Sequence, residues 1–374
     1  MLADKYRPRV LSDVVGQPVI VQTLTNAWNA KKLHQVYLFS GFLGSGKTSC
    51  ARIIAAMENC ETSPGLNPCG KCNSCKMIHN SNHPDVQEID AAGHFAKVEQ
   101  VRNFKNEAFY NPITTAKKKI FIIDEVHNLS GASFDALLKL LEEPPSHVRF
   151  VLCTTDPQKV KPTVLSRCQR HDFKKIYWSQ LAEQLNRICQ LEKIKAEAIA
   201  LNIVARFSGG SMRTAIQNLE TLISFVGDGN SLTAEQAQKM FGTADEMSYF
   251  DIIDHIIGMS GGKPDASESF KIINKLLADG ADFIQLYNGI AEHLRDIMVG
   301  YSSSNAWNFI ELSDEGKKRL LAQIKVLKEN KKFDAILESI RKLYEARRAV
   351  EYNISPEFAL QHWVIESIFA FRKQ

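Results

Sequence analysis

Hydrophobic positions in the first half of the chain form short runs that alternate with helical repeats. Strands are predicted at residues 36–39, 86–89, 120–123 and 150–154. Most of these are continuous apolar runs, which suit strands buried on both faces of a parallel sheet. Helices are predicted between them, at residues 18–31, 49–57, 97–109 and 133–143. Strands that alternate with helices indicate a three-layer α/β domain over residues 1–177.

No strand is predicted beyond residue 178, where the apolar positions follow a helical period. We expect a small helical domain at residues 178–242 and an all-helical domain at residues 243–374. The strongest helical period in the chain forms one apolar stripe of Phe333, Ile336, Leu337, Ile340, Leu343 and Tyr344. The other face of that helix carries charges of both signs, which favours a solvent-exposed face over a DNA contact.

Composition narrows the class of protein only slightly. The chain has 374 residues, of which 44% are hydrophobic and 24% charged, as in an ordinary globular protein. Its net charge of +4 permits a polyanionic partner without requiring one. No apolar stretch approaches the ~18 residues of a membrane span, and the start lacks the apolar core of a signal peptide. We therefore expect a cytoplasmic location.

The loop at residues 41–48 carries the strongest chemical signal. It follows a predicted strand, precedes a predicted helix, and reads Gly41, Phe42, Leu43, Gly44, Ser45, Gly46, Lys47 and Thr48. Glycines let backbone N–H groups turn toward a phosphate chain, and the helix N-terminus favours the same anion. The pattern predicts a phosphate-binding loop in which Lys47 reaches the β- and γ-phosphates and Thr48 holds Mg²⁺.

Two carboxylates follow the predicted strand at residues 120–123. Asp124 and Glu125 would lie at the carboxyl edge of the sheet, where α/β proteins bind ligands. We assign Asp124 to the Mg²⁺ shell and Glu125 to the attacking water, which it would orient or deprotonate. Alone, the pair could be a plain surface turn, but its position after a phosphate loop strengthens the assignment.

Three further side chains complete the predicted nucleotide site. Thr155 follows the strand at residues 150–154 and could contact the γ-phosphate or the water. Arg167 could reach a phosphate in a neighbouring subunit, because an arginine supplied in trans stabilises charge on a transferred phosphoryl group. Arg213 lies in the first turn of a helix, an unfavourable place for a cation that a nucleotide phosphate would relieve.

Four cysteines cluster between residues 60 and 75. They are Cys60, Cys69, Cys72 and Cys75, and they lie in a segment rich in Gly, Pro and Asn. In a reducing compartment such a cluster indicates metal more often than disulfides. Four thiolates suit tetrahedral Zn²⁺ with no open position, so the predicted zinc site is structural.

Together, these signals resemble the AAA+ ATPases, and most closely their clamp-loader branch. The segment with Tyr6, Arg7 and Val15 resembles the adenine-pocket segment of that family. Residues 137–145 and 154–159 look like the bacterial DNA polymerase III gamma/tau family, which carries a zinc module at the same place. The resemblance covers nearly the whole chain and is densest over residues 1–215.

The resemblance implies roles for several residues. Thr155 would be sensor 1, Arg167 the trans-acting finger and Arg213 sensor 2. Lys97 and Lys139 match positions that face DNA. Leu43 stands where the family usually has Arg, and Thr214 where it usually has Asp.

The resemblance also implies an ATP-hydrolysing, DNA-stimulated motor subunit of the clamp loader in the DNA polymerase III holoenzyme. Its expected partners are delta and delta-prime subunits, other gamma/tau copies, the sliding clamp and primer-template DNA. Polymerase and helicase are expected partners only of longer tau forms. Residues 243–374 would form an oligomerisation collar. The alternatives are a delta-prime-like subunit, which generally lacks a working phosphate loop, and a DNA-binding scaffold that uses ATP without turnover.

Overall fold

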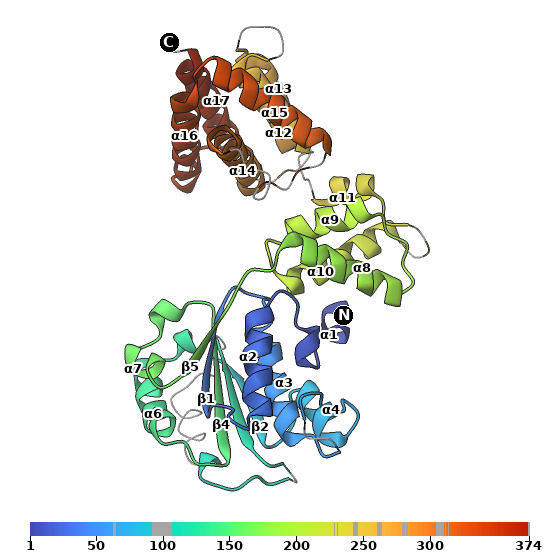
Figure 1. Cartoon of the computed structure of the whole chain (residues 1–374), viewed down its shortest axis with the longest axis vertical. Helices are drawn as coiled ribbons and strands as arrows, with labels where there is room; N and C mark the ends of the chain where they lie inside the picture. Colours follow the sequence, from blue (N-terminus) through green and yellow to red (C-terminus); the bar gives the residue numbers. More distant parts are fainter. Residues whose placement is uncertain are drawn as a thin grey trace. The chain divides into compact units, whose positions relative to one another are not determined.

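The computed structural model divides into two compact units, Met1–Thr233 and Ala234–Gln374 (Figure 1). It describes residues 1–62, 65–91, 107–114, 116–227, 229, 231–241, 246–259, 264–278, 281, 283–303, 310, 312 and 314–372, without the side chains of residues 135, 136, 139, 246, 285 and 314. The division into domains at residues 1–177, 178–242 and 243–374 stays a prediction.

A parallel five-stranded sheet forms the centre of the first unit. Its strands are β1 (Val36–Gly41), β2 (Val86–Asp90), β3 (Lys119–Asp124), β4 (Val148–Thr154) and β5 (Gln169–Phe173). They lie in the order β2-β3-β4-β1-β5, so β1 pairs with both β4 and β5. The predicted class, a parallel α/β domain followed by helices, is confirmed.

Alternate residues of the strands fill two separate cores, one on each face of the sheet. Tyr37, Phe39 and Ile122 pack with helices α2 (Pro18–Asn29) and α3 (Lys47–Asn59). Leu38 and Ile123 pack on the opposite face with α6 (Gly131–Glu142) (Figure 1). Burial on both faces explains why the central strands are continuously apolar.

Two elements around this sheet were not predicted. Strand β5 has the sequence QRHDF, in which only His171 and Phe173 are buried. It pairs only with β1 at the edge of the sheet, so its outer positions are polar. Helix α4 (Asn73–His79) holds the last predicted zinc ligand. Most of the helix predicted at residues 97–109 lies outside the described residues. The remaining short elements are α1 (Leu2–Lys5), η1 (Leu11–Asp13), η2 (Val126–Asn128), η3 (Pro157–Lys159) and α7 (Pro162–Leu165).

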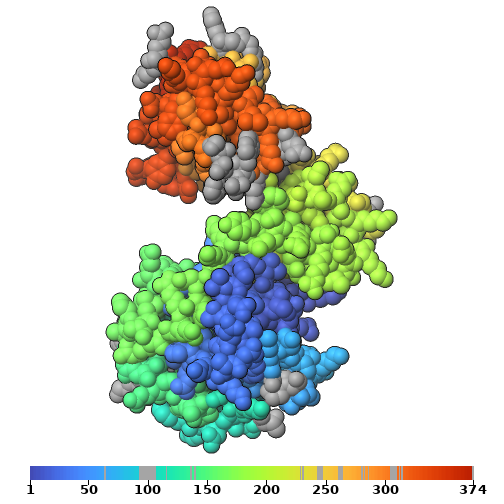
Figure 2. All heavy atoms as spheres, viewed as in Figure 1, coloured from blue at the N-terminus to red at the C-terminus, as the bar shows by residue number. Residues whose placement is uncertain are grey.

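Three helices, α8 (Trp178–Leu191), α9 (Ala198–Phe207) and α10 (Met212–Val226), follow the sheet within the first unit. The N-terminal residues contact both the segment after β5 and these helices. The side chain of Gln17 exchanges two hydrogen bonds with the backbone of Lys174, just after β5, at 2.7 and 3.0 Å. The backbone N–H of Leu2 donates to Glu220 in α10. Figure 2 shows the dark blue N-terminal surface lying against the yellow-green surface of these helices.

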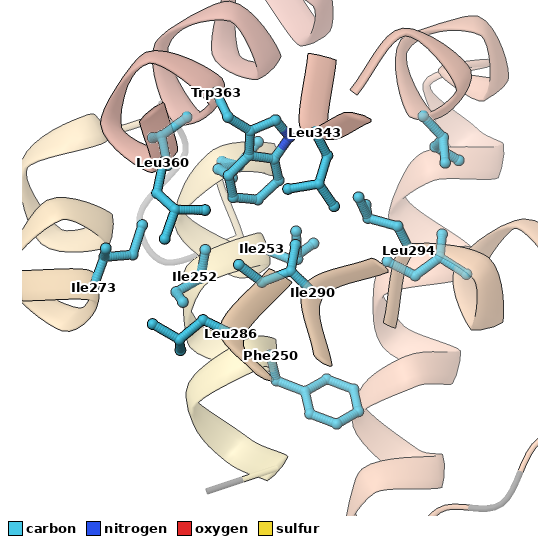
Figure 3. Packing of buried hydrophobic residues seen from close by; sticks show 14 of the residues in the cluster. Phe250, Ile252, Ile253, Ile273, Leu286, Ile290, Leu294, Leu343, Leu360 and Trp363 are labelled. Atoms are coloured by element: carbon cyan, nitrogen blue, oxygen red, sulfur yellow. The ribbon is translucent and has the colours of Figure 1, made fainter. Parts of the chain in front are cut away.

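The second unit is helical in its described part. Its helices are α11 (Ala234–Phe241), α12 (Glu246–Ile257), α13 (Ala266–Ala278), α14 (Phe283–Ser302), α15 (Asp314–Glu329), α16 (Phe333–Glu351) and α17 (Pro356–Arg372). The fully buried Trp363 lies among Leu343, Leu360 and the aliphatic side chains of α12 and α14 (Figure 3). Its indole N–H donates to the carbonyl of Ser339 at 3.0 Å, which fixes α17 against α16.

The buried stripe of α16 differs from the predicted one. Tyr344 is exposed, whereas Ser339 and Ala346 are buried. At Ser339 the two helices approach closely, since its hydroxyl group lies 2.8 Å from that of Ser367 in α17. The charged face of α16 forms exposed ion pairs such as Arg341–Glu338, as expected of a solvated surface. Across the described residues of both units, no helix is long and apolar enough to cross a bilayer.

Candidate functional site

The predicted phosphate loop joins β1 to α3 at the carboxyl edge of the sheet. Gly41, Gly44 and Gly46 all have positive φ angles, of 139°, 71° and 105°. At Gly41 a Cβ atom would lie 2.1 Å from the carbonyl oxygen of Phe173, so only glycine fits there. Helix α3 begins at Lys47, and its first N–H groups, which have no partner within the helix, face the loop.

Lys47 lies within this loop. Its side chain is buried, with 5% of the residue exposed. Its ammonium group donates to the carbonyl oxygens of Gly41 at 2.8 Å and Phe42 at 3.1 Å. Burial lowers the pKa of Lys47, and the carboxylates of Glu125 and Asp124 oppose that shift. A buried cation inside a ring of backbone dipoles is suited to an anionic ligand.

Thr48 and Asp124 meet across the gap between α3 and β3. The hydroxyl group of Thr48 donates to Oδ2 of Asp124 at 2.7 Å. Burial raises the pKa of Asp124, while the hydrogen bonds from Thr48 and from the backbone N–H of Glu125 act in the opposite direction. Hydroxyl and carboxylate oxygens are the ligands that Mg²⁺ prefers, so this donor set fits that ion.

Glu125 is held by the end of the neighbouring strand. Its Oε2 accepts hydrogen bonds from the backbone N–H of Thr155 at 3.1 Å and from the Thr155 hydroxyl at 2.8 Å. Nδ1 of His127 lies 3.3 Å from the same oxygen and 2.9 Å from the hydroxyl of Thr154. Glu125 also has a left-handed backbone, with φ 47°, which is uncommon for a residue other than glycine. The structure thus brings Glu125 and Thr155 into direct contact.

His127 and Thr154 were not among the predicted site residues. Thr154 ends the fully buried strand β4, and His127 lies in η2 just after the two carboxylates. The signal for His127 was its place two residues after Glu125. Its contact with Thr154 depends on the pairing of β3 with β4, which a single sequence does not specify.

The start of α10 packs directly on the phosphate loop. The backbone N–H of Met212 donates to the carbonyl of Gly44 at 3.2 Å. A Cβ atom at Gly44 would lie 2.1 Å from Oγ of Ser211 and 3.2 Å from Cβ of Arg213. The Cβ atom of Arg213 therefore lies beside the loop. Oγ of Ser211 caps α10 and accepts from the N–H and the hydroxyl of Thr214.

The predicted adenine-pocket residues lie on the N-terminal segment. The hydroxyl of Tyr6 donates to Glu192 after α8, and the ammonium of Lys5 lies 2.5 Å from the same carboxylate. Burial lowers the pKa of Arg7, and the nearby guanidinium of Arg52 adds to this shift. Val15 is half-buried. This segment thus connects the sheet domain to the helices α8–α10.

Among the other predicted loop residues, Phe42 and Leu43 are exposed and Ser45 is buried. Leu43 is 56% exposed and makes no part of the core. The ring of Phe42 lies 4.5 Å from the ammonium of Lys175. Ser45 donates from its hydroxyl to the carbonyl of Phe42 at 2.7 Å, which closes the turn.

Arg167 makes its contacts apart from this cluster. Its guanidinium pairs with Glu142 at 2.7 Å and donates to the carbonyl of Thr163 at 2.6 Å. Lys97 lies outside the described residues. Lys139 lies in α6, but its side chain is outside the description.

The four clustered cysteines converge in the structure. The sulfur atoms of Cys60, Cys69, Cys72 and Cys75 all lie within 4.8 Å of one another. Backbone N–H groups point at three of them, for example Cys72 N to Cys69 Sγ at 3.2 Å and Cys75 N to Cys72 Sγ at 3.4 Å. Such donors stabilise thiolates. The donor set fits a closed tetrahedral metal site.

The surroundings of the cluster shift the pKa values of two of its cysteines in opposite directions. Hydrogen bonds from Thr62 and from the backbone at Cys72 and Lys71 lower the pKa of Cys69 to about 6. Burial raises the pKa of Cys75, a buried ligand in α4. A metal ion would remove that cost, because a coordinated thiol is deprotonated outright.

Comparison with known proteins places the chain in a family. The family model described as DNA polymerase III, delta subunit matches residues 16–177, and the model for domain III of DNA polymerase III subunits gamma and tau matches residues 232–350. DNA polymerase III subunit gamma of Buchnera aphidicola is 39% identical over 257 residues, covering 69% of this chain and 67% of that protein. The chain belongs to the DNA polymerase III gamma/tau family.

Longer gamma/tau relatives are similarly close in sequence. DNA polymerase III subunit tau of Bacillus subtilis is 39% identical over 79% of this chain and 51% of its own length. The Escherichia coli tau subunit is 40% identical over 76% of this chain and 43% of its own length. The chain thus spans about half the length of the tau subunits that it matches. The match to gamma/tau domain III favours this family over the delta-prime alternative.

Proposed function

We propose that this chain binds ATP with Mg²⁺ and hydrolyses it as the motor subunit of a bacterial sliding-clamp loader. The observation that carries the proposal is the cluster of Lys47, Thr48, Asp124, Glu125 and Thr155 at one edge of the sheet, in a member of the gamma/tau family. A delta-prime-like subunit would not need this complete set.

Binding is assigned to the phosphate loop and its neighbours. The backbone N–H groups of residues 41–48 would enclose the phosphates, and Lys47 would turn its ammonium from the loop carbonyls to the β- and γ-phosphates. Thr48 and Asp124 would hold Mg²⁺, which neutralises charge on the phosphates when bound. Arg213 would contact the phosphates from α10. Tyr6, Arg7 and Val15 would line the adenine pocket.

Hydrolysis is assigned to Glu125 and Thr155. Glu125 would orient the attacking water and accept its proton, and Thr155 would position that water and the γ-phosphate. Because Thr155 donates two hydrogen bonds to Glu125 in this structure, it also determines where the carboxylate lies. Arg167 of an adjacent copy would stabilise the charge that develops on the γ-phosphoryl group.

The cysteine cluster is proposed to bind one structural Zn²⁺. Four soft ligands with hydrogen-bonded sulfurs support this, and they leave no position for a catalytic water. We expect Cys72→Ser to lower bound zinc from about one ion per chain. Cys168→Ser, a half-buried cysteine outside the cluster, is the control and should leave metal content unchanged. Unchanged zinc in Cys72→Ser would remove the metal from the proposal.

Partners are proposed from the family assignment. They are delta and delta-prime subunits, further gamma/tau copies, the sliding clamp and primer-template DNA, with polymerase and helicase for a longer tau form. Residues 243–374 would form the collar through which copies assemble. Lys97 and Lys139 are proposed DNA contacts.

The deciding experiment is phosphate release by the chain assembled with delta, delta-prime and clamp, with and without primed DNA. We expect DNA to stimulate release by the parent and Glu125→Gln to bind ATP but release phosphate at least about 100-fold more slowly. Glu143→Gln, an exposed carboxylate after α6, is the control.

Three other outcomes would each reject a part of the proposal. Equal rates for Glu125→Gln and the parent would show that Glu125 is not the base. ATP binding without release by the parent would favour the scaffold alternative. No affinity for ATP with Mg²⁺ and partners present would reject the whole proposal.

A further inference from the structure

The side chain of Arg167 is bound on one side by its own chain. Nη2 lies 2.7 Å from Oε1 of Glu142, and Nη1 donates to the carbonyl of Thr163 at 2.6 Å and to Oγ of Ser166 at 3.3 Å. Arg167 is nevertheless one-third exposed, at 34% of its side chain. The guanidinium is therefore fixed but still accessible.

Glu142 occupies an unfavourable place for a carboxylate. It is the last residue of α6, where the helix dipole repels negative charge. Its side chain is 45% exposed, and an ion pair as exposed as this one contributes little to folding stability. The contact is therefore better explained by its effect on Arg167 than by its effect on the fold.

The donor groups of Arg167 are only partly used. A guanidinium has five N–H donors in a fixed plane. The three contacts above occupy three of them, and the contacts among the described residues leave the N–H of Nε and one N–H of Nη2. A carboxylate on one edge and free donors on the other suit an arginine that is offered to an external anion.

We propose that Glu142 is a positioning residue that holds Arg167 ready for the triphosphate bound by a neighbouring copy. The inference rests on the proposed function, since it needs Arg167 to act in trans. A free arginine side chain would have to be ordered each time a neighbour's site closes. Glu142 and the carbonyl of Thr163 order it in advance, so the gain is in turnover and not in nucleotide affinity.

The first test compares turnover of Glu142→Ala and Glu142→Gln with the parent in the assembled complex with primed DNA. We expect Glu142→Ala to lower kcat about tenfold with an unchanged KM for ATP. Glu142→Gln keeps an acceptor oxygen without the charge and should lose about threefold. Glu338→Ala removes a carboxylate of similar exposure (42%) from the ion pair with Arg341, and is the matched control. Melting curves should be unchanged in all three variants.

The second test asks whether the defect acts in trans. Glu142→Ala has an intact phosphate loop and a weak finger, whereas Lys47→Ala has a defective loop and an intact finger. Copies of the two, co-expressed with different tags and purified through both, should recover activity well above either variant alone. The pair of Glu142→Ala with Arg167→Ala contains no well-positioned finger and should not recover.

Several results would overturn the inference. Turnover of Glu142→Ala equal to the parent would show that Arg167 needs no positioning, and faster turnover would show that Glu142 restrains it instead. A raised KM or a failure of the Lys47→Ala copy to complement would place the defect in the variant's own site. If the parent itself releases no phosphate, the proposed function fails. If Arg167→Ala is slow and Glu142→Ala is normal, only this inference fails.

Discussion

The carboxyl edge of the sheet and the core of the second unit both bury polar side chains, but they satisfy them differently. In the second unit, Gln323 donates to Asp254 at 2.6 Å and lies 2.9 Å from the imidazole of His293, while Arg319 pairs with Asp254 at 2.5 Å. These side chains therefore bond to one another. At the sheet edge, the ammonium of Lys47 donates to two backbone carbonyls, and no carboxylate among the described residues forms an ion pair with it.

This difference distinguishes a structural network from a binding site. A network of polar groups that bond to one another specifies how helices pack. A buried cation beside positive-φ backbone and a helix N-terminus is poised for an external anion. Substitutions in the two regions should therefore separate activity from stability.

The largest effect is expected for Lys47→Ala. Removing the ammonium should lower phosphate release about 1,000-fold, because it removes a charge that stabilises the transferred phosphoryl group. Stability should be unchanged or slightly higher, since burial lowers the pKa of Lys47 and the charged form is therefore disfavoured in the fold. Phosphate release and thermal melting measure the two effects. A strong loss of stability would place Lys47 with the structural networks.

A second prediction concerns the stability of the fold at acid pH. Burial lowers the pKa of His293 to about 4, against 6.5 for an exposed histidine. Between pH 6.5 and 4, His293 therefore binds a proton in the unfolded chain but not in the folded chain. Its contribution to the free energy of unfolding is present above this pH range and is lost as the pH falls through it. At about 1.4 kcal/mol per pH unit, the loss approaches 3 kcal/mol.

Urea unfolding at pH 7, 5.5 and 4 tests this behaviour of His293. The amide of Gln323 donates to Asp254, so its oxygen faces the imidazole, and His293→Gln keeps an N–H donor toward that oxygen. The variant should lose less stability on acidification than the parent. The same acid dependence in both would show that other groups cause it.

The smallest effect is expected for Thr155→Val at the sheet edge. It removes the hydroxyl bond of 2.8 Å to Glu125 but leaves the backbone N–H bond of 3.1 Å. A lost hydrogen bond of about 1 kcal/mol corresponds to roughly fivefold slower phosphate release. Thr155→Ser should restore the rate. Equal rates for the valine and serine variants would show that the hydroxyl has no part in turnover.

The sheet was predictable where burial left a simple pattern. The runs at 120–123 and 150–154 lie within β3 and β4, because strands covered on both faces can hold only apolar side chains. Strand β5 was missed because an edge strand keeps polar residues such as Gln169 and Arg170. Tyr344 was placed wrongly because hydrophobic spacing did not show that α16 buries the small residues Ser339 and Ala346.

The meeting of these side chains at the sheet edge was predictable because each carries a signal that is local in sequence, while their role in nucleotide binding stays a prediction. A loop, a strand end and a helix start each carry their own signal, and strand pairing brings Asp124 close to Thr48. The contact between Arg167 and Glu142 joins the turn after α7 to the last residue of α6, and neither sequence contains a sign of it. The same holds for Ser211 against Gly44, which only the packing of α10 reveals.

That last contact has a mechanical consequence. The peptide unit of Gly44 offers its carbonyl to Met212 and leaves no room for a side chain beside Ser211. Any rotation of this peptide as an anion settles against the loop must also push or pull on the beginning of α10. Because a helix moves nearly as a rigid body, a shift of less than an ångström at its first turn displaces the whole helix. Gly44 could in this way couple a change in the loop to a movement of α10.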